Sequence, residues 1–369
     1  MNGKRAVISF LGNINYDTRA RNLYFSLVEL GYDVNTLSFD WYNRPQGGSI
    51  PVVRLSKSVS SLFFYLKFIL TVVRGLSLNK YDLYIASDIY NLPFLSFFAR
   101  FRGKPLFYDS RELFRYLAGL KGKQKVQKLL AWIENKYIRD CDNIIVTGWM
   151  DAEVLIEDYG LPEGKFILLR NLPHRFEILN PLDIRAKYGF PDNSVILIYQ
   201  GVILNGRGLK ILIKALKQLE KTCLVIMGDG DLKSELESRI ENEGLTERVV
   251  FTGTIPQSDI LSYTAAADIG CTLIENISKS YYYALPNKMF EYIAAGIPVL
   301  ASNLPQMMQV IDEYGVGKYV DPDDIESVVA GIKELSDSGR KKEIAEKARK
   351  AHLELNWEAE FSRVKHHFS

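Results

Sequence analysis

The sequence predicts an α/β protein of two doubly wound domains, each with a parallel sheet between layers of helices. Short apolar runs with strand character alternate with helical patterns along the whole chain, and this alternation is typical of parallel sheets covered on both faces. A stretch with two prolines and no periodicity, residues 173–182, divides the alternation into two series and reads as a linker. The 369 residues are enough for about two domains of ordinary size.

The first series, residues 1–172, predicts an N-terminal Rossmann-like domain. Its strand-like runs are separated by longer stretches with helical periodicity, such as 19–30 and 126–139. The expected strands are 5–11, 34–39, 82–86, 105–108, 143–147 and 165–169.

The second series, residues 183–355, predicts a C-terminal domain of the same architecture. The last helix, 357–368, carries apolar residues at i, i+4, i+7 and i+11. Ligands of such sheets bind at the carboxyl ends of the strands, so we expect the site in a cleft between the domains. The expected strands are 195–200, 224–227, 249–252, 269–273, 298–301 and 317–320.

The composition narrows the function classes. A hydrophobic content of 47% with 24% charged residues is ordinary for a globular protein and excludes a disordered one. The formal net charge of +2 gives no electrostatic case for nucleic acid as a partner. Cys141, Cys223 and Cys271 are scattered, which argues against a disulfide framework or a zinc site and favours a cytoplasmic setting.

Residues 62–76 form a very apolar stretch. They are fewer than the ~20 residues needed to span a bilayer, and Lys67 and Arg74 interrupt them. We therefore expect a core helix and reject a transmembrane span. The alternative is a helix that lies on a membrane surface with its basic residues toward anionic lipid. A second basic and aromatic cluster follows at 97–104.

The most informative segment, residues 281–303, predicts a ligand site at the start of a helix. Pro286 suits the first turn of a helix, where its missing N–H would have no partner anyway. Lys288 and Glu291 are three residues apart and share one face, and Gly296 is a suitable stop. A helix N-terminus attracts phosphate, and a carboxylate one turn deeper can accept hydrogen bonds from sugar hydroxyls. Many βα units with these features bind nothing, so the pattern alone leaves both interpretations open.

This segment, LPNK-x-FEY-x-AAG-x-PV, resembles the donor-binding segment of the retaining GT-B glycosyltransferases of family four, which build cell-surface polysaccharides and glycolipids. The resemblance is strong over residues 195–320 and looser over 1–170. It implies the GT-B architecture, with two doubly wound Rossmann-like domains facing across a cleft. The acceptor would bind the first domain and the nucleotide sugar the second. The resemblance also implies that residues 356–369 pack back on the first domain.

The resemblance assigns phosphate binding to the loop after the strand that ends at Gln200. Arg207 matches the family's basic residue just before the next helix and can hold phosphate oxygens through two hydrogen bonds. Val202 replaces a second basic residue of the family, so we expect Lys288 to share the task. The loop also looks like a P-loop, but Arg207-Gly208 stands where a Lys-Ser/Thr pair is needed.

Glu291 matches the second glutamate of the family's paired-glutamate motif, which holds the nucleotide ribose. Tyr283 stands in the position of the first glutamate and cannot supply a carboxylate, and Glu275 in the preceding loop is a candidate substitute. Glycine-bearing strand-end turns border the base pocket in the family, although backbone needs alone also explain glycine there. The expected donor-binding residues are Gly12, Gly201, Arg207, Gly228, Gly253, Thr254, Tyr283, Leu285, Pro286, Asn287, Lys288 and Glu291.

Residues 107–114 resemble the family's aspartate–small–histidine–glutamate segment, with Arg111 in the histidine position. Asp109 and Glu112 could orient or deprotonate an acceptor hydroxyl. Equally, they could form surface ion pairs with Arg111 and Arg115. The expected catalytic residues are Asp109, Glu112, Arg207 and Lys288.

The expected function is transfer of a sugar from a nucleotide diphosphate sugar to a saccharide or lipid-linked acceptor, with retention and without a metal or other cofactor. The expected partners are this donor, this acceptor and a membrane surface, with the protein cytoplasmic and peripheral at the inner membrane face. One alternative is a nucleotide-sugar binding protein or partner subunit without transfer activity, because Tyr283 and Arg111 replace polar residues of the family. Another is a GT-B nucleotide-sugar epimerase, against which the shortage of suitably placed histidines argues.

Overall fold

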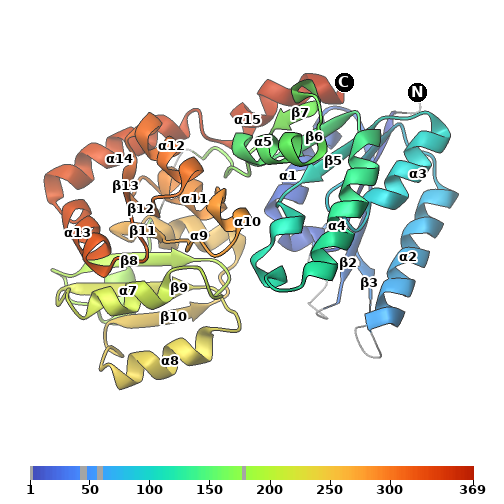
Figure 1. Ribbon diagram of the computed structural model, residues 1–369. Helices are drawn as coiled ribbons and strands as arrows, with labels where there is room; N and C mark the ends of the chain where they lie inside the picture. The colour runs from blue at the N-terminus through green and yellow to red at the C-terminus, as the bar shows by residue number, and fades with distance from the viewer. Residues whose placement is uncertain (1–2, 42–47, 56–60, 177–179) are drawn as a thin grey trace. The chain divides into compact units, whose positions relative to one another are not determined.

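The computed structural model describes residues 3–41, 48–55, 61–176 and 180–369 (Figure 1). The chain divides into two compact units, which are Met1–Asn171 with Phe361–Ser369, and Leu172–Glu360. We call them unit 1 and unit 2. Residues 177–179 of the expected linker lie outside the described residues. Leu172, just before that linker, is buried in the apolar core of unit 2.

Within the described residues, unit 1 contains a parallel sheet of seven strands in the order β3-β2-β1-β4-β5-β6-β7. The chain adds β2 and β3 on one side of β1 and β4 on the other, so the switch point lies between β1 and β4. The strand β3 was not predicted, because two residues are too few for a pattern. The strands are β1 (Arg5–Phe10), β2 (Asp33–Asp40), β3 (Val53–Arg54), β4 (Leu83–Ala86), β5 (Leu106–Ser110), β6 (Asn143–Val146) and β7 (Phe166–Leu168), and the α-helices between them are α1 (Thr18–Glu29), α2 (Ser61–Leu78), α3 (Leu92–Arg102), α4 (Gln124–Tyr137) and α5 (Trp149–Tyr159).

Unit 2 has a parallel sheet of six strands among its described residues, in the order β10-β9-β8-β11-β12-β13. Its switch point lies between β8 and β11. The strands are β8 (Val195–Gln200), β9 (Thr222–Met227), β10 (Val249–Gly253), β11 (Ile269–Thr272), β12 (Val299–Ser302) and β13 (Gly317–Val320). The α-helices are α6 (Ile184–Tyr188), α7 (Leu209–Leu216), α8 (Lys233–Asn242), α9 (Gln257–Thr264), α10 (Lys279–Tyr282), α11 (Asn287–Ala295), α12 (Pro305–Tyr314), α13 (Ile325–Leu335), α14 (Ser338–His352) and α15 (Trp357–Val364), whose last turns belong to unit 1.

The sheet of unit 2 is buried on both faces. Leu197 and Tyr199 of β8 pack in a cluster with α7, α8 and α13. Ile196 and Ile198 of the same strand pack in a second cluster with α11 and α12. A strand covered on both sides reads as a continuous apolar run, and this is why β8 is visible in the sequence.

The end of the chain belongs to unit 1. Phe368 is buried, and its ring centre lies 5.0 Å from that of Phe107 in β5. The hydroxyl of Tyr32 donates a hydrogen bond of 2.8 Å to the carbonyl oxygen of Phe368. These contacts attach the last residues to the sheet formed by the first half of the chain.

Helix α2 is not the core helix expected from its composition. A single stripe is buried on it, formed by Phe64, Phe68, Val72 and Leu76 at intervals of one turn. By length and composition, α2 could cross a membrane. The buried stripe instead holds the helix against unit 1, and the rest of its surface is left uncovered, since only 22% of the helix is buried. It is therefore a surface helix with an apolar outer face.

Candidate functional site

Two strand-end loops of unit 2 meet at its switch point. The loop after β8 ends at Gly208, whose φ is 74°, and a Cβ there would lie 2.1 Å from the carbonyl oxygen of Leu273, just after β11. Only glycine therefore allows α7 to start against β11. The carboxylate of Glu275 accepts a hydrogen bond of 3.3 Å from the Gly208 N–H. The partial positive charge at the start of α7 thus already faces a carboxylate of the protein itself.

The glycines expected around the nucleotide lie together at the ends of β8, β9 and β10. A Cβ on Gly228, whose φ is 135°, would lie 2.0 Å from the carbonyl oxygen of Gly201. The N–H of Gly228 donates a hydrogen bond of 2.9 Å to the carbonyl oxygen of Gly253, and Thr254 follows in an exposed position. The structure therefore brings Gly201, Gly228 and Gly253 side by side, as a surface without side chains.

Lys288 lies beside this surface, in the first turn of α11, and is buried. Its Nζ is 3.6 Å from the centre of the Tyr199 ring, and a Cβ on Gly201 would lie 3.4 Å from it. Among the described residues, this Nζ has no hydrogen-bond or ion-pair partner. Burial and, next, the positive charge of Arg207 hold the pKa of Lys288 well below its usual value. Lys288 is thus a buried amine that contacts the face of an aromatic ring.

Arg207 is the second cation of this site and is half-buried. Its guanidinium carbon lies 4.7 Å from the centre of the Tyr281 ring. Within the described part of the chain no carboxylate comes within ion-pair distance of it. Lys288 and Arg207 therefore act on one another near the switch point, and within the described ranges their direct partners are aromatic rings and not carboxylates.

The start of α11 adds a third positive feature. The helix begins at Asn287, with Pro286 as its N-cap, so Pro286 lies one position before the first turn in which it was expected. Its first turn contains no acidic residue and its N-cap makes no side-chain hydrogen bond, which leaves the first N–H groups of the helix for a ligand. Leu285 fixes the approach to the helix by packing against the core, and Gly296 ends the helix with a φ of 73°, as predicted.

Glu291 lies one turn deeper in α11, and its carboxylate accepts a hydrogen bond from the side-chain amide of Gln200. The side-chain oxygen of Gln200, Oε1, in turn accepts a hydrogen bond of 2.8 Å from the hydroxyl of Thr264. Burial raises the pKa of Glu291, and the bond from Gln200 and the charge of Lys288 partly offset this. Sequence reasoning missed both residues. Gln200 had an available signal, because it is a polar residue that ends an apolar strand, whereas Thr264 is the last residue of α9 and had none.

Tyr283 and Glu275 occupy the positions considered for a second carboxylate. The backbone carbonyl oxygen of Tyr283 accepts a hydrogen bond from the side-chain amide of Gln306. The Tyr283 ring packs edge-on against the Tyr282 ring, with 4.9 Å between the ring centres. Glu275 holds the start of α7. The structure thus provides a carboxylate near Arg207, but that carboxylate already accepts a hydrogen bond from the backbone.

The switch point of unit 1 is formed by the loop after β1. The Leu11 N–H donates to the carboxylate of Asp88, and the Asn91 N–H donates to the same carboxylate at 2.8 Å. Burial raises the pKa of Asp88. A pocket of about 240 Å³ opens beside this loop. Its lining includes Gly12, together with Phe10, Leu11, Asn13, Tyr16, Asp17, Phe39, Asp40 and Trp41.

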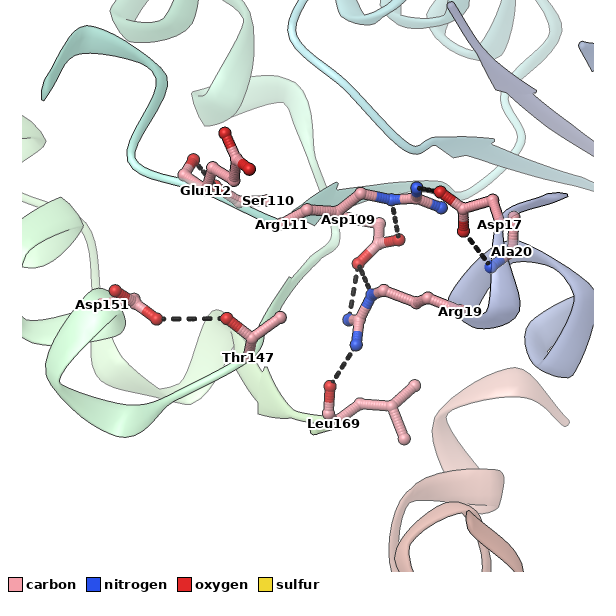
Figure 2. Close-up of polar contacts among 10 residues, drawn as sticks. All are labelled: Asp17, Arg19, Ala20, Asp109, Ser110, Arg111, Glu112, Thr147, Asp151 and Leu169. Atoms are coloured by element: carbon pink, nitrogen blue, oxygen red, sulfur yellow. Dashed lines mark hydrogen bonds and ion pairs between the residues drawn. The ribbon is translucent and has the colours of Figure 1, made fainter. Parts of the chain in front are cut away.

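Asp109 forms the centre of a buried ion cluster (Figure 2). One of its oxygens accepts hydrogen bonds of 2.9 and 2.6 Å from Arg19, and the other accepts one of 3.1 Å from Arg111. Arg111 also donates to Asp17 at 2.6 Å. Burial alone favours the neutral form of Asp109, but the charges of Arg19 and Arg111 outweigh it and lower the pKa of that carboxyl.

This cluster corrects the role expected for Asp109. Its side chain is fully buried and both oxygens are engaged, so it cannot accept a proton from a bound hydroxyl. The alternative of an ion pair between Asp109 and Arg111 is confirmed, but this pair is internal and does not lie at the surface. Glu112 is exposed, and Figure 2 shows its side chain pointing away from the cluster. Arg115 is paired with Asp158 at 3.7 Å.

The described residues contain no group of three or more His, Cys, Asp or Glu side chains that could hold a metal ion. In the candidate site of unit 2, Arg207 and Glu291 both act electrostatically on Lys288.

Comparisons with known families match both units. The model of the family "Glycosyl transferases group 1" matches residues 182–351, and that of the "Glycosyl transferase 4-like domain" matches residues 16–171. An uncharacterized glycosyltransferase of Methanocaldococcus jannaschii is 28% identical over 220 residues, which are 57% of this chain and 55% of that protein. A putative colanic acid biosynthesis glycosyl transferase of Escherichia coli is 26% identical over 230 residues, 58% of this chain and 55% of its own length. The chain thus spans about half the length of these curated relatives.

Solved structures match along nearly the whole chain. Sucrose-phosphate synthase from Thermosynechococcus elongatus superposes with a TM-score of 0.79 at 18% identity, covering 99% of this chain and 98% of that one. The crystal structure of HepE from Anabaena, in complex with UDP and glucose, gives a TM-score of 0.74 at 17% identity and covers 99% of both chains.

Proposed function

Because the chain belongs to the group 1 glycosyltransferases and has their GT-B fold, we propose that it transfers a sugar from a nucleotide diphosphate sugar to a saccharide or lipid-linked acceptor. One observation carries this proposal. Arg207 and Lys288 have no carboxylate partner among the described residues and act on one another, and Lys288 lies in the uncapped first turn of α11. An anion with several oxygens and more than one negative charge would satisfy all three features together.

A diphosphate is such an anion, and it is also the leaving group of the proposed reaction. When the bond between sugar and diphosphate breaks, negative charge grows on the phosphate oxygens and positive charge on the sugar. Fixed cations and helix N–H groups near those oxygens stabilise this transition state more than the ground state. In our proposal Arg207, Lys288 and the N–H groups of Asn287 and Lys288 supply this stabilisation, and no metal ion is required for it.

Glu291 is placed to recognise the nucleoside part of the donor. Its carboxylate lies one helical turn from Lys288 and is oriented by Gln200. Carboxylates in this situation accept hydrogen bonds from vicinal hydroxyls such as those of ribose. The surface formed by Gly201, Gly228 and Gly253 lets a flat base lie against the backbone. We propose that Tyr283 and Thr254 border the bound donor.

The identity of the two substrates is the finer part of the proposal. The complex of HepE with UDP and glucose supports a uridine diphosphate sugar as the first donor to try. The name of the Escherichia coli relative supports a saccharide acceptor in polysaccharide biosynthesis. We propose that the anomeric configuration of the sugar is retained, as the resemblance implies.

A donor and acceptor panel tests the proposal. The purified protein is incubated with UDP- and GDP-sugars and with oligosaccharide or lipid-linked acceptors, and products are identified by mass spectrometry and proton NMR. The expected result is an acceptor extended by one sugar whose anomeric coupling matches that of the donor. Binding of nucleotide sugars without any transfer or hydrolysis would support a binding protein instead. An inverted hydroxyl on the free nucleotide sugar would support an epimerase.

A further inference from the structure

The outer surface of α2, α3 and α4 in unit 1 carries large apolar side chains that the fold leaves in solvent. Helix α3 packs against both α2 and α4, and Figure 1 shows the three helices in one layer. On α2, Leu62, Leu66 and Leu70 lie opposite the buried stripe and are 73%, 48% and 67% exposed. We call this surface the helical face.

The other two helices continue the same pattern. On α3, the rings of Phe97 and Phe101 are stacked 6.3 Å apart and are 64% and 79% exposed. On α4, Trp132 is 58% exposed and Leu129 is 54% exposed. Isolated exposed apolar residues need no explanation, but several large ones spread over three neighbouring helices indicate an interaction surface.

The charged side chains that α2, α3 and α4 themselves expose are all basic, and one of them, Arg100, lies 3.9 Å from Asp140, which follows α4. Lys67, Arg74, Arg100, Lys125, Lys128 and Lys136 are exposed on these three helices. Their one acidic residue is Glu134 of α4, which is buried and accepts hydrogen bonds of 2.7 Å from Tyr108 and Tyr159. The surface therefore offers cations and apolar groups together, without exposed carboxylates on the same helices.

The cations also sit close to the aromatic rings. Lys67 Nζ lies 4.9 Å from the centre of the Phe63 ring, and Lys136 Nζ lies 5.1 Å from that of Trp132. Long basic side chains beside aromatic ones can keep their charge at the level of lipid phosphates while the apolar parts enter the layer below.

We propose that the helical face binds the surface of an anionic phospholipid bilayer. The leucines of α2, the two phenylalanines of α3 and Trp132 enter the interface, while the lysines and arginines contact lipid phosphates. A second copy of the chain fits less well, because a twofold contact would place this positive surface against itself. The buried stripe of α2 holds the helix against unit 1, so it lies along the membrane instead of crossing it. This proposal goes beyond the proposed sugar transfer and uses none of the residues of that site.

Vesicle sedimentation of the full chain tests it. Vesicles of phosphatidylcholine alone are compared with vesicles that also contain phosphatidylglycerol, at low and high salt. We expect binding to the anionic vesicles that weakens with salt, because the Lys and Arg contacts are screened. The double variant Lys67→Gln/Arg74→Gln is expected to bind them at least tenfold more weakly, since each cation near an anionic surface contributes about fivefold.

An apolar double variant and two matched controls complete the experiment. Leu66→Gln/Leu70→Gln is expected to lose at least tenfold in vesicle affinity, whereas Leu353→Gln, at an exposed leucine of unit 2, and Lys214→Gln/Lys217→Gln should bind like the original chain. UDP affinity, measured on every variant, reports correct folding and separates this proposal from the proposed function. Equal binding to neutral and anionic vesicles, or no binding, would overturn the proposal. So would a dimer in size-exclusion chromatography that only the Leu66→Gln/Leu70→Gln variant fails to form.

Discussion

The amine of Lys288 lies 3.6 Å from the centre of the Tyr199 ring, on a strand 89 positions away in the sequence of unit 2. No carboxylate among the described residues forms an ion pair with it, and burial holds its pKa well below the usual value. A buried amine without an ion-pair partner is unfavourable for the folded protein, so we propose that a bound anion supplies one.

The first prediction concerns Lys288 as a phosphate ligand. Lys288→Met keeps the length of the side chain and removes its charge. We expect UDP affinity to fall at least tenfold, because a hydrogen bond to a charged group contributes ~1.5–3 kcal/mol. Isothermal titration calorimetry measures this, with Lys217→Met at an exposed position of unit 2 as the control. Equal affinity in a folded Lys288→Met protein would remove Lys288 from the site.

The second prediction separates the phosphate part of the site from the nucleoside part. Glu291→Ala should weaken UDP binding at least tenfold, because it removes the carboxylate that we assign to the ribose. Pyrophosphate has no ribose, so its affinity should fall in Lys288→Met and stay unchanged in Glu291→Ala. Loss of pyrophosphate binding in both variants would mean that Glu291 acts on Lys288 or on the fold instead.

The third prediction is uptake of a proton when the donor binds. Burial lowers the pKa of Lys288 in the free protein, and a bound diphosphate raises it again because it stabilises the ammonium form. At a pH between the pKa of Lys288 in the free protein and its higher pKa in the complex, the complex holds more protons than the free protein. UDP affinity therefore falls as pH rises through this range. At pH 8 the phosphates of UDP are already ionised. Calorimetry in two buffers of different ionisation enthalpy should therefore detect uptake in the original chain and none in Lys288→Met.

The fourth prediction concerns Glu134, which lies between the hydroxyls of Tyr108 and Tyr159. Burial raises the pKa of this carboxyl from 4.5 to about 6. The folded state therefore binds a proton at Glu134 more tightly than the unfolded state does. The stability that protonated Glu134 contributes is fully present below pH 4.5 and is lost as pH rises through 6. Relative to Glu134→Gln, the free energy of unfolding should fall by about 2 kcal/mol across this range. Parallel pH profiles in urea denaturation would contradict this.

The fifth prediction tests the corrected role of Asp109. Asp109→Asn leaves the buried cations Arg19 and Arg111 with less negative charge, so we expect the free energy of unfolding to fall by about 3–5 kcal/mol. Glu112→Gln, at an exposed position of the same segment, is the control and should change stability little. A stable Asp109→Asn protein without transfer activity would instead restore Asp109 as a group that acts on the acceptor.

Local pattern was enough to predict most of the fold. The strand Val195–Gln200 was predicted with its bounds because burial on both faces leaves an unbroken apolar run. Helix α11 was predicted to within one residue, since proline and glycine mark its two ends. Composition failed for α2, because it cannot tell which side of an apolar helix the sheet covers.

The partners of the site residues could not be predicted in this way. Gln200 and Glu291 are 91 positions apart, and Arg19 and Asp109 are 90 apart. Such pairs depend on which strands become neighbours in the sheet, and no local periodicity records that. Asp109 was therefore predicted to face a ligand, although Arg19 from α1 forms an internal ion pair with it.

The most direct test of the account is release of nucleoside diphosphate from nucleotide sugars, measured for the original chain and for Lys288→Met. At least one UDP- or GDP-sugar should yield diphosphate with the original chain, faster when a saccharide or lipid-linked acceptor is present. The Lys288→Met protein should release it at least ten times more slowly, because the leaving diphosphate loses a charged hydrogen bond worth ~1.5–3 kcal/mol. Equal rates in the two proteins, or binding of the donors without any release, would contradict a diphosphate site at Arg207, Lys288 and the start of α11 that serves sugar transfer.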